Sequence, residues 1–155
     1  MHHPTDVRLL CESLEWLYRH LCKDSPRPGI RRPRNKYDDV SRACAAHSKK
    51  RKRKASCTKM LKRRLINLLE TLLHQTDHLH SSYRKLLGHR ADYHRRLSVI
   101  RKTLEQQKQL FEGKKEIHNR IVSIDRHYVR PIVRGKESRS VEFGAKVNNI
   151  QYLLY

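Results

Sequence analysis

Acidic residues are scarce in this chain. Its 155 residues include 15 Asp or Glu against 36 Lys or Arg, which leaves a formal net charge of +21. Self-repulsion of this size opposes a compact state unless a polyanion or counterions neutralise it. The apolar fraction of 37% is also below the roughly 45–50% of typical globular domains, so we expect one domain or a piece of one, with a thin core.

Long hydrophobic runs are missing as well. No stretch approaches the roughly 18 apolar residues that a bilayer span requires, and the first residues, MHHPTD, contain no apolar signal-peptide core. We therefore expect neither a membrane partner nor secretion, and we place the chain in the cytoplasm. Five Gly and five Pro exclude a collagen-like or low-complexity chain.

Cysteine is sparse, with four residues and no C-x-x-C pair. Cys44 and His47 form a C-x-x-H pair, but no second pair has the spacing of a zinc finger, so we expect no metal site there. Cys11 and Cys22 lie eleven residues apart, which places both on one face of a helix. We interpret them as reduced, small apolar side chains.

The positive charge is concentrated in one part of the chain. Residues 26–69 contain sixteen basic side chains and two acidic ones, a net charge of +14, whereas residues 1–25 have a net charge of −1. The densest run is KKRKRK at 49–54. Nucleic acid is the commonest intracellular polyanion, and basic side chains that bind its phosphates release counterions. The alternatives are a solvated basic face, a disordered arm or a nuclear import signal.

The apolar spacing predicts four helices, which could pack as an antiparallel coiled-coil arm. The first begins at the cap residue Thr5, and a loop at about 24–37 follows it. A weaker helix with a poor apolar face is expected at about 38–54. A long helix follows from about Ser56 to Gly88, with a break near Thr76, and the last helix ends at about Glu112 with Gly113 as its C-cap.

After Gly113 the pattern changes to that of strands. Short β-branched or alternating runs occupy 120–125, 129–133 and 141–147, with a turn at 134–138. The expected fold class is therefore mainly α with a small C-terminal β part. We divide the chain into a basic helical region at 1–118, a partial sheet at 119–149 and an apolar tail at 150–155.

Three segments closely resemble bacterial insertion-sequence transposases of the DDE type. They are RIVSI at 120–124, VRPIVRGK at 129–136 and VEFGAKV at 141–147. The N-terminal PTD at 4–6, followed by Leu9, Leu10, Glu12 and Glu15, is similar to the same group. Cys11 stands where that group usually has Asn, and Asn119 stands where it usually has Asp. The resemblance implies a long helical insertion followed by two or three strands of an incomplete ribonuclease-H-like sheet.

The resemblance also implies a reaction that this chain is not expected to perform. Such transposases cut DNA and transfer strands with two divalent ions, Mg²⁺ for the full-length family, held by two Asp and one Glu. In the family these positions lie before the PTD stretch and beyond the FGAK strand, so we expect a fragment truncated at both ends. We therefore assign no catalytic residue, no metal ligand and no cofactor, and we expect no metal-dependent cleavage of DNA.

Other catalytic chemistry has little support. Asp125 and Glu142 flank predicted strands and could approach each other around a metal ion, but surface pairing with neighbouring arginines is the better interpretation. No G-x-S-x-G nucleophile elbow and no glycine-rich phosphate loop occurs. Among the tyrosines that could stack on bases, Tyr83 and Tyr93 fall at helical core positions.

We expect DNA to be the main partner, with a full-length transposase or a second copy of the chain as further partners. For a bacterial protein of this kind, the expected location is the cytoplasm, at the nucleoid when DNA is bound. The alternative is a self-standing basic helical protein, nucleic-acid-binding or an interaction module, unrelated to transposition. The candidate DNA-binding residues are Lys49, Lys50, Arg51, Lys52, Arg53, Lys54, Arg63, Arg64, Arg130, Arg134 and Lys136.

Overall fold

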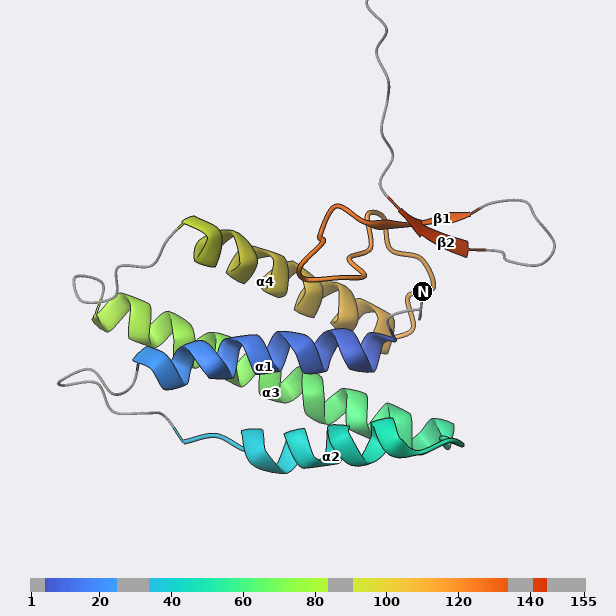
Figure 1. The fold of residues 1–155 in the computed structure, drawn as a ribbon, viewed down its shortest axis with the longest axis horizontal. Helices are drawn as coiled ribbons and strands as arrows, with labels where there is room; N and C mark the ends of the chain where they lie inside the picture. Colours follow the sequence, from blue (N-terminus) through green and yellow to red (C-terminus); the bar gives the residue numbers. More distant parts are fainter. Residues whose placement is uncertain (1–4, 25–33, 84–90, 134–140, 145–155) are drawn as a thin grey trace, which may run out of the picture.

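A computed structural model describes residues 5–24, 34–83, 91–133 and 141–144 of the chain. These residues form four helices, α1 (Asp6–Asp24), α2 (Tyr37–Lys49), α3 (Ala55–Ser82) and α4 (Ala91–Phe111). The strands β1 (Arg130–Val133) and β2 (Val141–Gly144) follow. Helix α3 packs against all three other helices, and α1 and α3 lie between α2 and α4 (Figure 1).

The core is built mainly from leucines of α1 and α3, with apolar residues of α4 beside them. Leu10, Leu17, Leu65, Leu69 and Leu72 are almost completely buried, and burial of each contributes about 1.5–3 kcal/mol. Helix α2 buries only Val40. The expected poor apolar face of this helix is therefore confirmed.

Both predicted ends of the helical part are capped as the sequence indicates. The Thr5 Oγ1 accepts a hydrogen bond from the Arg8 N–H at 3.3 Å at the start of α1. At the end of α4, Gly113 has a positive φ of 105°. The Gly113 N–H bonds to the Leu110 carbonyl and the Lys114 N–H to the Gln109 carbonyl, which is the Schellman pattern.

The predicted break near Thr76 does not occur. Helix α3 continues through this position to Ser82, because the buried Thr76 hydroxyl donates to the Leu72 carbonyl at 2.8 Å within the helix. The predicted core positions of Tyr83 and Tyr93 are confirmed, since Tyr93 is buried and Tyr83 packs against the core.

The predicted strand at 120–125 is wrong. This segment is irregular and folds back on the helices. The Ile121 N–H donates to the Gln106 Oε1 of α4 at 2.8 Å, and Ile121, Val122 and Ile124 are buried. A side chain of α4 therefore takes the hydrogen bond that a neighbouring strand would have taken.

The expected fold class, a mainly α chain that ends in part of a ribonuclease-H-like sheet, is also wrong. The described residues form a helical bundle. Strands β1 and β2 are four residues each, pair antiparallel with Arg130 opposite Gly144, and contact no described helix. Two such strands do not make a ribonuclease-H-like sheet, and the tail at 150–155 lies outside the described residues.

Candidate nucleic-acid interface

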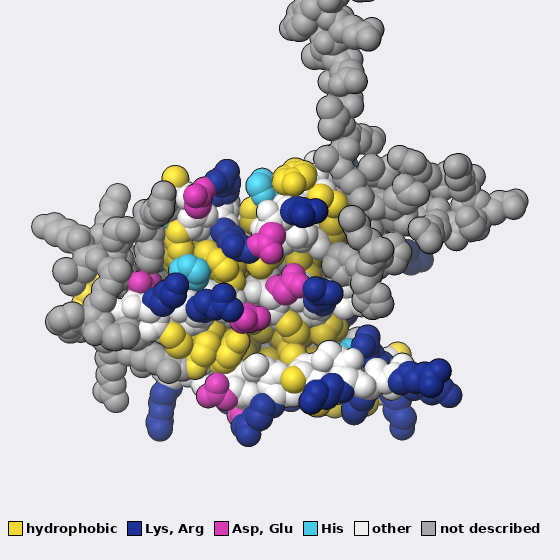
Figure 2. All heavy atoms as spheres, viewed as in Figure 1, with side chains coloured by type: hydrophobic (Ala, Val, Ile, Leu, Met, Phe, Trp, Pro, Cys, Tyr) yellow, Lys and Arg dark blue, Asp and Glu magenta, His cyan; other side chains and the backbone are white. Residues whose placement is uncertain are grey.

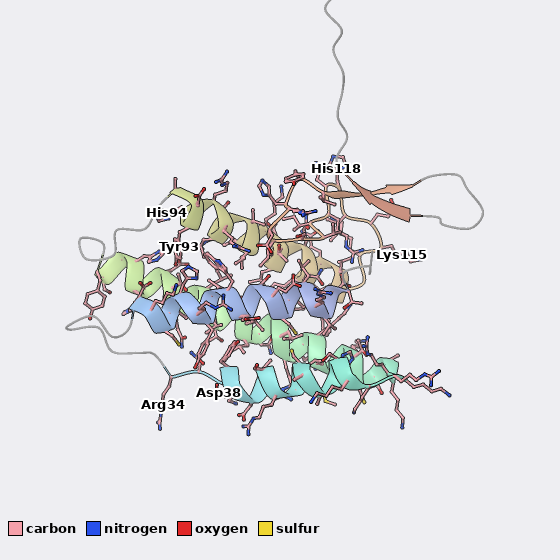
Figure 3. The ribbon with its side chains drawn as sticks, viewed as in Figure 1. Arg34, Asp38, Tyr93, His94, Lys115 and His118 are labelled. Atoms are coloured by element: carbon pink, nitrogen blue, oxygen red, sulfur yellow. The ribbon has the colours of Figure 1, made fainter. Side chains whose placement is uncertain are left out.

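The strongest concentration of positive charge lies where α2 ends and α3 begins. We call this surface the basic tip. It lies at the end of the molecule where α1 starts and α4 ends (Figure 1), and dark-blue side chains gather there along α2 (Figure 2). The basic tip comprises Lys49, Lys50, Arg51, Lys52, Arg53, Lys54, Lys59, Arg63 and Arg64, all of them exposed.

No ion pair neutralises the basic tip within the described residues. Between Asp39 and Glu70 the sequence contains no Asp or Glu, and within the described part of the chain no ion pair involves a residue of the tip. Elsewhere several cations are paired. Arg8 bonds to Glu12 at 2.8 Å, for example, and Lys108 bonds to Glu70 at 2.6 Å. The tip is therefore a dense group of cations that no described ion pair neutralises.

Arg53 has a structural role that the sequence did not indicate. Its guanidinium folds back onto the C-terminal end of α2, where Nε donates to the His47 carbonyl and Nη2 to the Ser48 carbonyl, both at 3.2 Å. These carbonyls lack partners within the helix, and a cation at this end also favours the helix dipole. Arg53 thus holds the basic run in place while it keeps its charge.

The cations at the start of α3 point to different sides of that helix. Arg63 and Lys59 lie over the Phe111 ring of α4, at 5.6 Å and 6.0 Å from its centroid. Arg64 lines a hollow of about 240 Å³ between α2 and α3, together with Met60, which is 63% exposed. The tip therefore presents charge over a broad surface.

His47 links the end of α2 to the start of α3. Its Nε2 is 3.0 Å from the Thr58 Oγ1. Burial, together with the nearby charges of Arg53 and Lys50, holds the pKa of His47 below its ordinary value. The C-x-x-H pattern of Cys44 and His47 thus corresponds to a polar contact between two helices.

Beside the tip, Asp6 at the start of α1 binds side chains from three distant segments. Its carboxylate accepts hydrogen bonds from Lys62 at 2.7 Å, from Gln107 at 3.1 Å and from Arg120. Burial alone would raise the pKa of Asp6, but the bonds from Lys62 and Gln107 and the charge of Arg120 outweigh it and lower the pKa. The sequence showed Asp6 only as part of the PTD motif and gave no sign of this cluster.

A hollow of about 330 Å³ opens next to this cluster. It lies between the start of α1, the junction of α2 with α3, and the segment that precedes β1. Thr5, Asp6, Arg53, Lys62 and Arg120 are among its lining residues. Three of these carry positive charge and one carries negative charge.

Of the remaining predicted DNA-binding residues, the structure describes Arg130 alone. Arg130 is the first residue of β1, on the strand pair that contacts no described helix. Arg134 and Lys136 lie outside the described residues. The helical candidates therefore form one surface, and the C-terminal candidates stay predictions.

The possible carboxylate pair gains no support from the described residues. Asp125 forms an ion pair with Arg96 of α4, whose guanidinium lies 5.6 Å from the Trp16 ring centroid. Glu142 pairs with Ile132 in the register of β1 and β2. Within the described ranges, no three His, Cys, Asp or Glu side chains gather as metal ligands would.

Two half-buried thiols meet where α1 packs on α2. A hydrogen bond with Cys44 and burial raise the pKa of Cys11, whereas the same bond lowers the pKa of Cys44, helped by the charge of Arg64. Both side chains line a hollow of about 200 Å³ with Tyr37 and Val40. Sequence analysis paired Cys11 with Cys22 on one helix face and missed this contact between helices.

The chain was compared with protein-family models, curated proteins and solved structures, and none of the three comparisons finds a match. Among the described helices, none combines the length and the apolar character needed to cross a membrane. The arguments for function therefore come from the residues of the chain itself.

Proposed function

We propose that this chain binds double-stranded DNA through the basic tip. The observation that carries the proposal is the group of nine exposed cations with no acidic partner among the described residues. From Ala55 to Arg64, helix α3 extends about 15 Å, and duplex DNA carries about nine phosphates over that length. Three cations of the tip, Lys59, Arg63 and Arg64, lie on this stretch, and the six at 49–54 directly precede it, so several phosphates can be contacted at once.

The resemblance of 120–147 to insertion-sequence transposases favours DNA over other polyanions. On this proposal the chain derives from such an enzyme and retains binding of DNA, and we assign it no catalytic step. The PTD motif and the three C-terminal motifs occur in the order that the resemblance requires, although the run at 120–125 forms no strand. The described helical bundle also fits the alternative of a self-standing basic nucleic-acid-binding protein.

Salt titration tests the proposal directly. The affinity for a labelled duplex of about 20 base pairs is measured by fluorescence anisotropy between about 50 and 200 mM salt. If six of the cations neutralise phosphates, log K falls with log salt at a slope of about −5. An affinity that does not change with salt would contradict the proposal.

A pair of matched variants localises the interface. Lys50→Gln with Lys52→Gln removes two charges from the tip, and we expect the magnitude of the slope to decrease by about 1.8. The control, Arg19→Gln with Arg95→Gln, removes two exposed charges that are ion-paired and lie toward the other end of the helices. Equal losses from both pairs would show that overall charge, and not the tip, binds DNA.

The origin of the chain can be tested separately. Translation of the DNA on both sides of the reading frame, in all frames, is expected to show strands that carry the acidic residues of a DDE enzyme. Unrelated flanking genes would favour the self-standing protein. Light scattering of the purified chain, alone and with a full-length transposase, tests the expected protein partners.

A further inference from the structure

The hollow beside Asp6 holds more positive charge than its own acid neutralises. Arg53, Lys62 and Arg120 reach it from three separate parts of the chain, and Asp6 is the acid that lines it. The side chains of Lys62 and Asp6 are 28% and 19% exposed. Two positive charges therefore remain at a partly enclosed site, where water screens them less than on the open surface.

Hydrogen-bond donors also remain at this site. The Lys62 ammonium has three donors, and one of them bonds to Asp6. The Arg120 Nε–H is buried and has no hydrogen-bond partner in the described part of the chain, although Nη2 bonds to Asp6. The Thr5 oxygen acts as an acceptor at the start of α1, and no acceptor for its hydroxyl proton is found among the described residues. The positive end of the α1 dipole adds to the attraction for an anion.

The arrangement of the donors indicates which anion fits. Cations from three separate segments suit a tetrahedral group with several oxygens better than a planar carboxylate with two. The volume of about 330 Å³ also leaves room for an atom chain attached to that group. Arg53 belongs both to this hollow and to the basic tip, so a phosphate here would continue the surface to which DNA is proposed to bind.

We propose that this hollow binds one phosphate group, and that in a DNA complex it holds a backbone phosphate beside the basic tip. The second part rests on the proposed function. A free phosphate ion offers the same chemistry, so inorganic phosphate and duplex DNA are tested as separate ligands.

Arg120→Gln is the central variant. Glutamine can still donate to Asp6, but it removes the charge and the unsatisfied Nε–H. The control is Arg126→Gln, which removes an exposed charge six residues further along the same segment, away from the hollow lining. Arg120→Lys, which restores the charge, and a circular-dichroism spectrum separate loss of binding from loss of fold.

Inorganic phosphate is titrated by NMR, and DNA binding is measured as a function of salt for each variant. We expect Arg120→Gln to weaken phosphate binding at least tenfold and to decrease the magnitude of the DNA salt slope by about 0.9. We expect Arg126→Gln to change neither measurably and Arg120→Lys to restore most of both. Equal behaviour of Arg120→Gln and Arg126→Gln with both ligands would overturn the proposal.

Two further outcomes separate the proposals. A change with phosphate but none with DNA would support the phosphate site and overturn its place in the DNA complex. The double variant Lys50→Gln, Lys52→Gln could weaken DNA binding while Arg120→Gln has no effect on either ligand. That result would overturn the phosphate site and support DNA binding by the basic tip. If wild-type protein does not bind DNA, the proposed function fails, whatever the phosphate titration shows.

Discussion

Helices α2 and α3 meet at the same basic junction, yet they are held to the molecule in different ways. Helix α3 buries nine residues, most of them leucines, whereas α2 buries Val40 alone. Helix α2 is fastened at its ends instead. Arg53 and the His47–Thr58 contact hold its last turn, and Tyr37 stacks on Tyr18 at a centroid distance of 3.6 Å near its start.

This difference shows how one stretch of sequence divides its residues between two tasks. Side chains that carry charge to the surface cannot also fill a core, so a strongly basic helix has few apolar contacts to stabilise it. Contacts at the two ends, aromatic at the start and polar at the last turn, then fix its position, and each contributes about 1 kcal/mol. The four predictions that follow test this contrast, from the largest expected effect to the smallest.

The largest effect is expected from core truncation. Leu69→Ala removes a fully buried side chain of α3, and we expect it to lower the free energy of unfolding by about 2–5 kcal/mol. Val40→Ala should lower the free energy of unfolding by about 1–2 kcal/mol, because it removes two buried methyl groups and Val40 is the one residue that α2 buries. Urea denaturation followed by circular dichroism measures both. Equal losses would mean that α2 shares fully in the core.

Hydrogen exchange should show the same contrast without mutation. We expect the amides of α2 to exchange at least tenfold faster than the central amides of α3, a difference of about 1.4 kcal/mol in opening free energy. The physical reason is that α2 covers only a few core leucines, among them Leu14, Leu61 and Leu68, so it can detach while most leucines of α1 and α3 stay buried. Protection of α2 equal to that of α3 would contradict a separately opening helix.

Arg53→Ala tests the fastening at the end of α2. Loss of its two bonds to the His47 and Ser48 carbonyls should lower stability by about 1 kcal/mol and increase exchange in the last turn of α2. The matched control is Lys52→Ala, which removes a neighbouring exposed charge and should change stability by less than about 0.5 kcal/mol. If the two variants are equally stable, the cap contributes nothing.

The smallest effect concerns pH. The pKa of His47 is held below its ordinary value in the folded state, so the unfolded chain binds more protons near pH 6. Stability from this group is present above about pH 6.5 and is lost as the pH falls through the lower, folded-state pKa.

Comparison of wild type with His47→Gln isolates this effect. The urea midpoint of wild type should decrease slightly more between about pH 7.5 and pH 5 than that of the variant, which lacks the titrating ring. A larger decrease in the variant would show that the sign is wrong.

The sequence predicted the four helices because their signals are local. Apolar spacing, the Thr5 cap and Gly113 act within one or two turns, where few competing interactions enter. The run at 120–125 resembled a strand for the same local reason, since β-branched residues are concentrated there. Its conformation depends on Gln106, which takes the Ile121 N–H and donates to the Asn119 carbonyl at 3.2 Å. No sequence pattern near residue 120 indicates that Gln106 is its partner.

In the candidate site, too, local features were predictable and contacts between distant residues were not. Exposure of Lys49 to Lys54 follows from charge density and was predictable, whereas the role of Arg53 depends on where its guanidinium meets backbone carbonyls. The Asp6 cluster joins residues separated by 56, 101 and 114 positions. Such pairs leave no trace in spacing, so a single sequence could not reveal the hollow beside them.

The close packing of α1 on α3 has a consequence for synthesis on the ribosome. Asp6 meets Lys62, 56 positions later, so the apolar stripe of α1 emerges long before the leucines that cover it. At about 5–20 residues per second, roughly 3–10 s pass in between, during which Leu10 and Leu17 remain open to chaperones or to other nascent chains. Slower translation of the codons for the basic residues 49–54 would lengthen that interval.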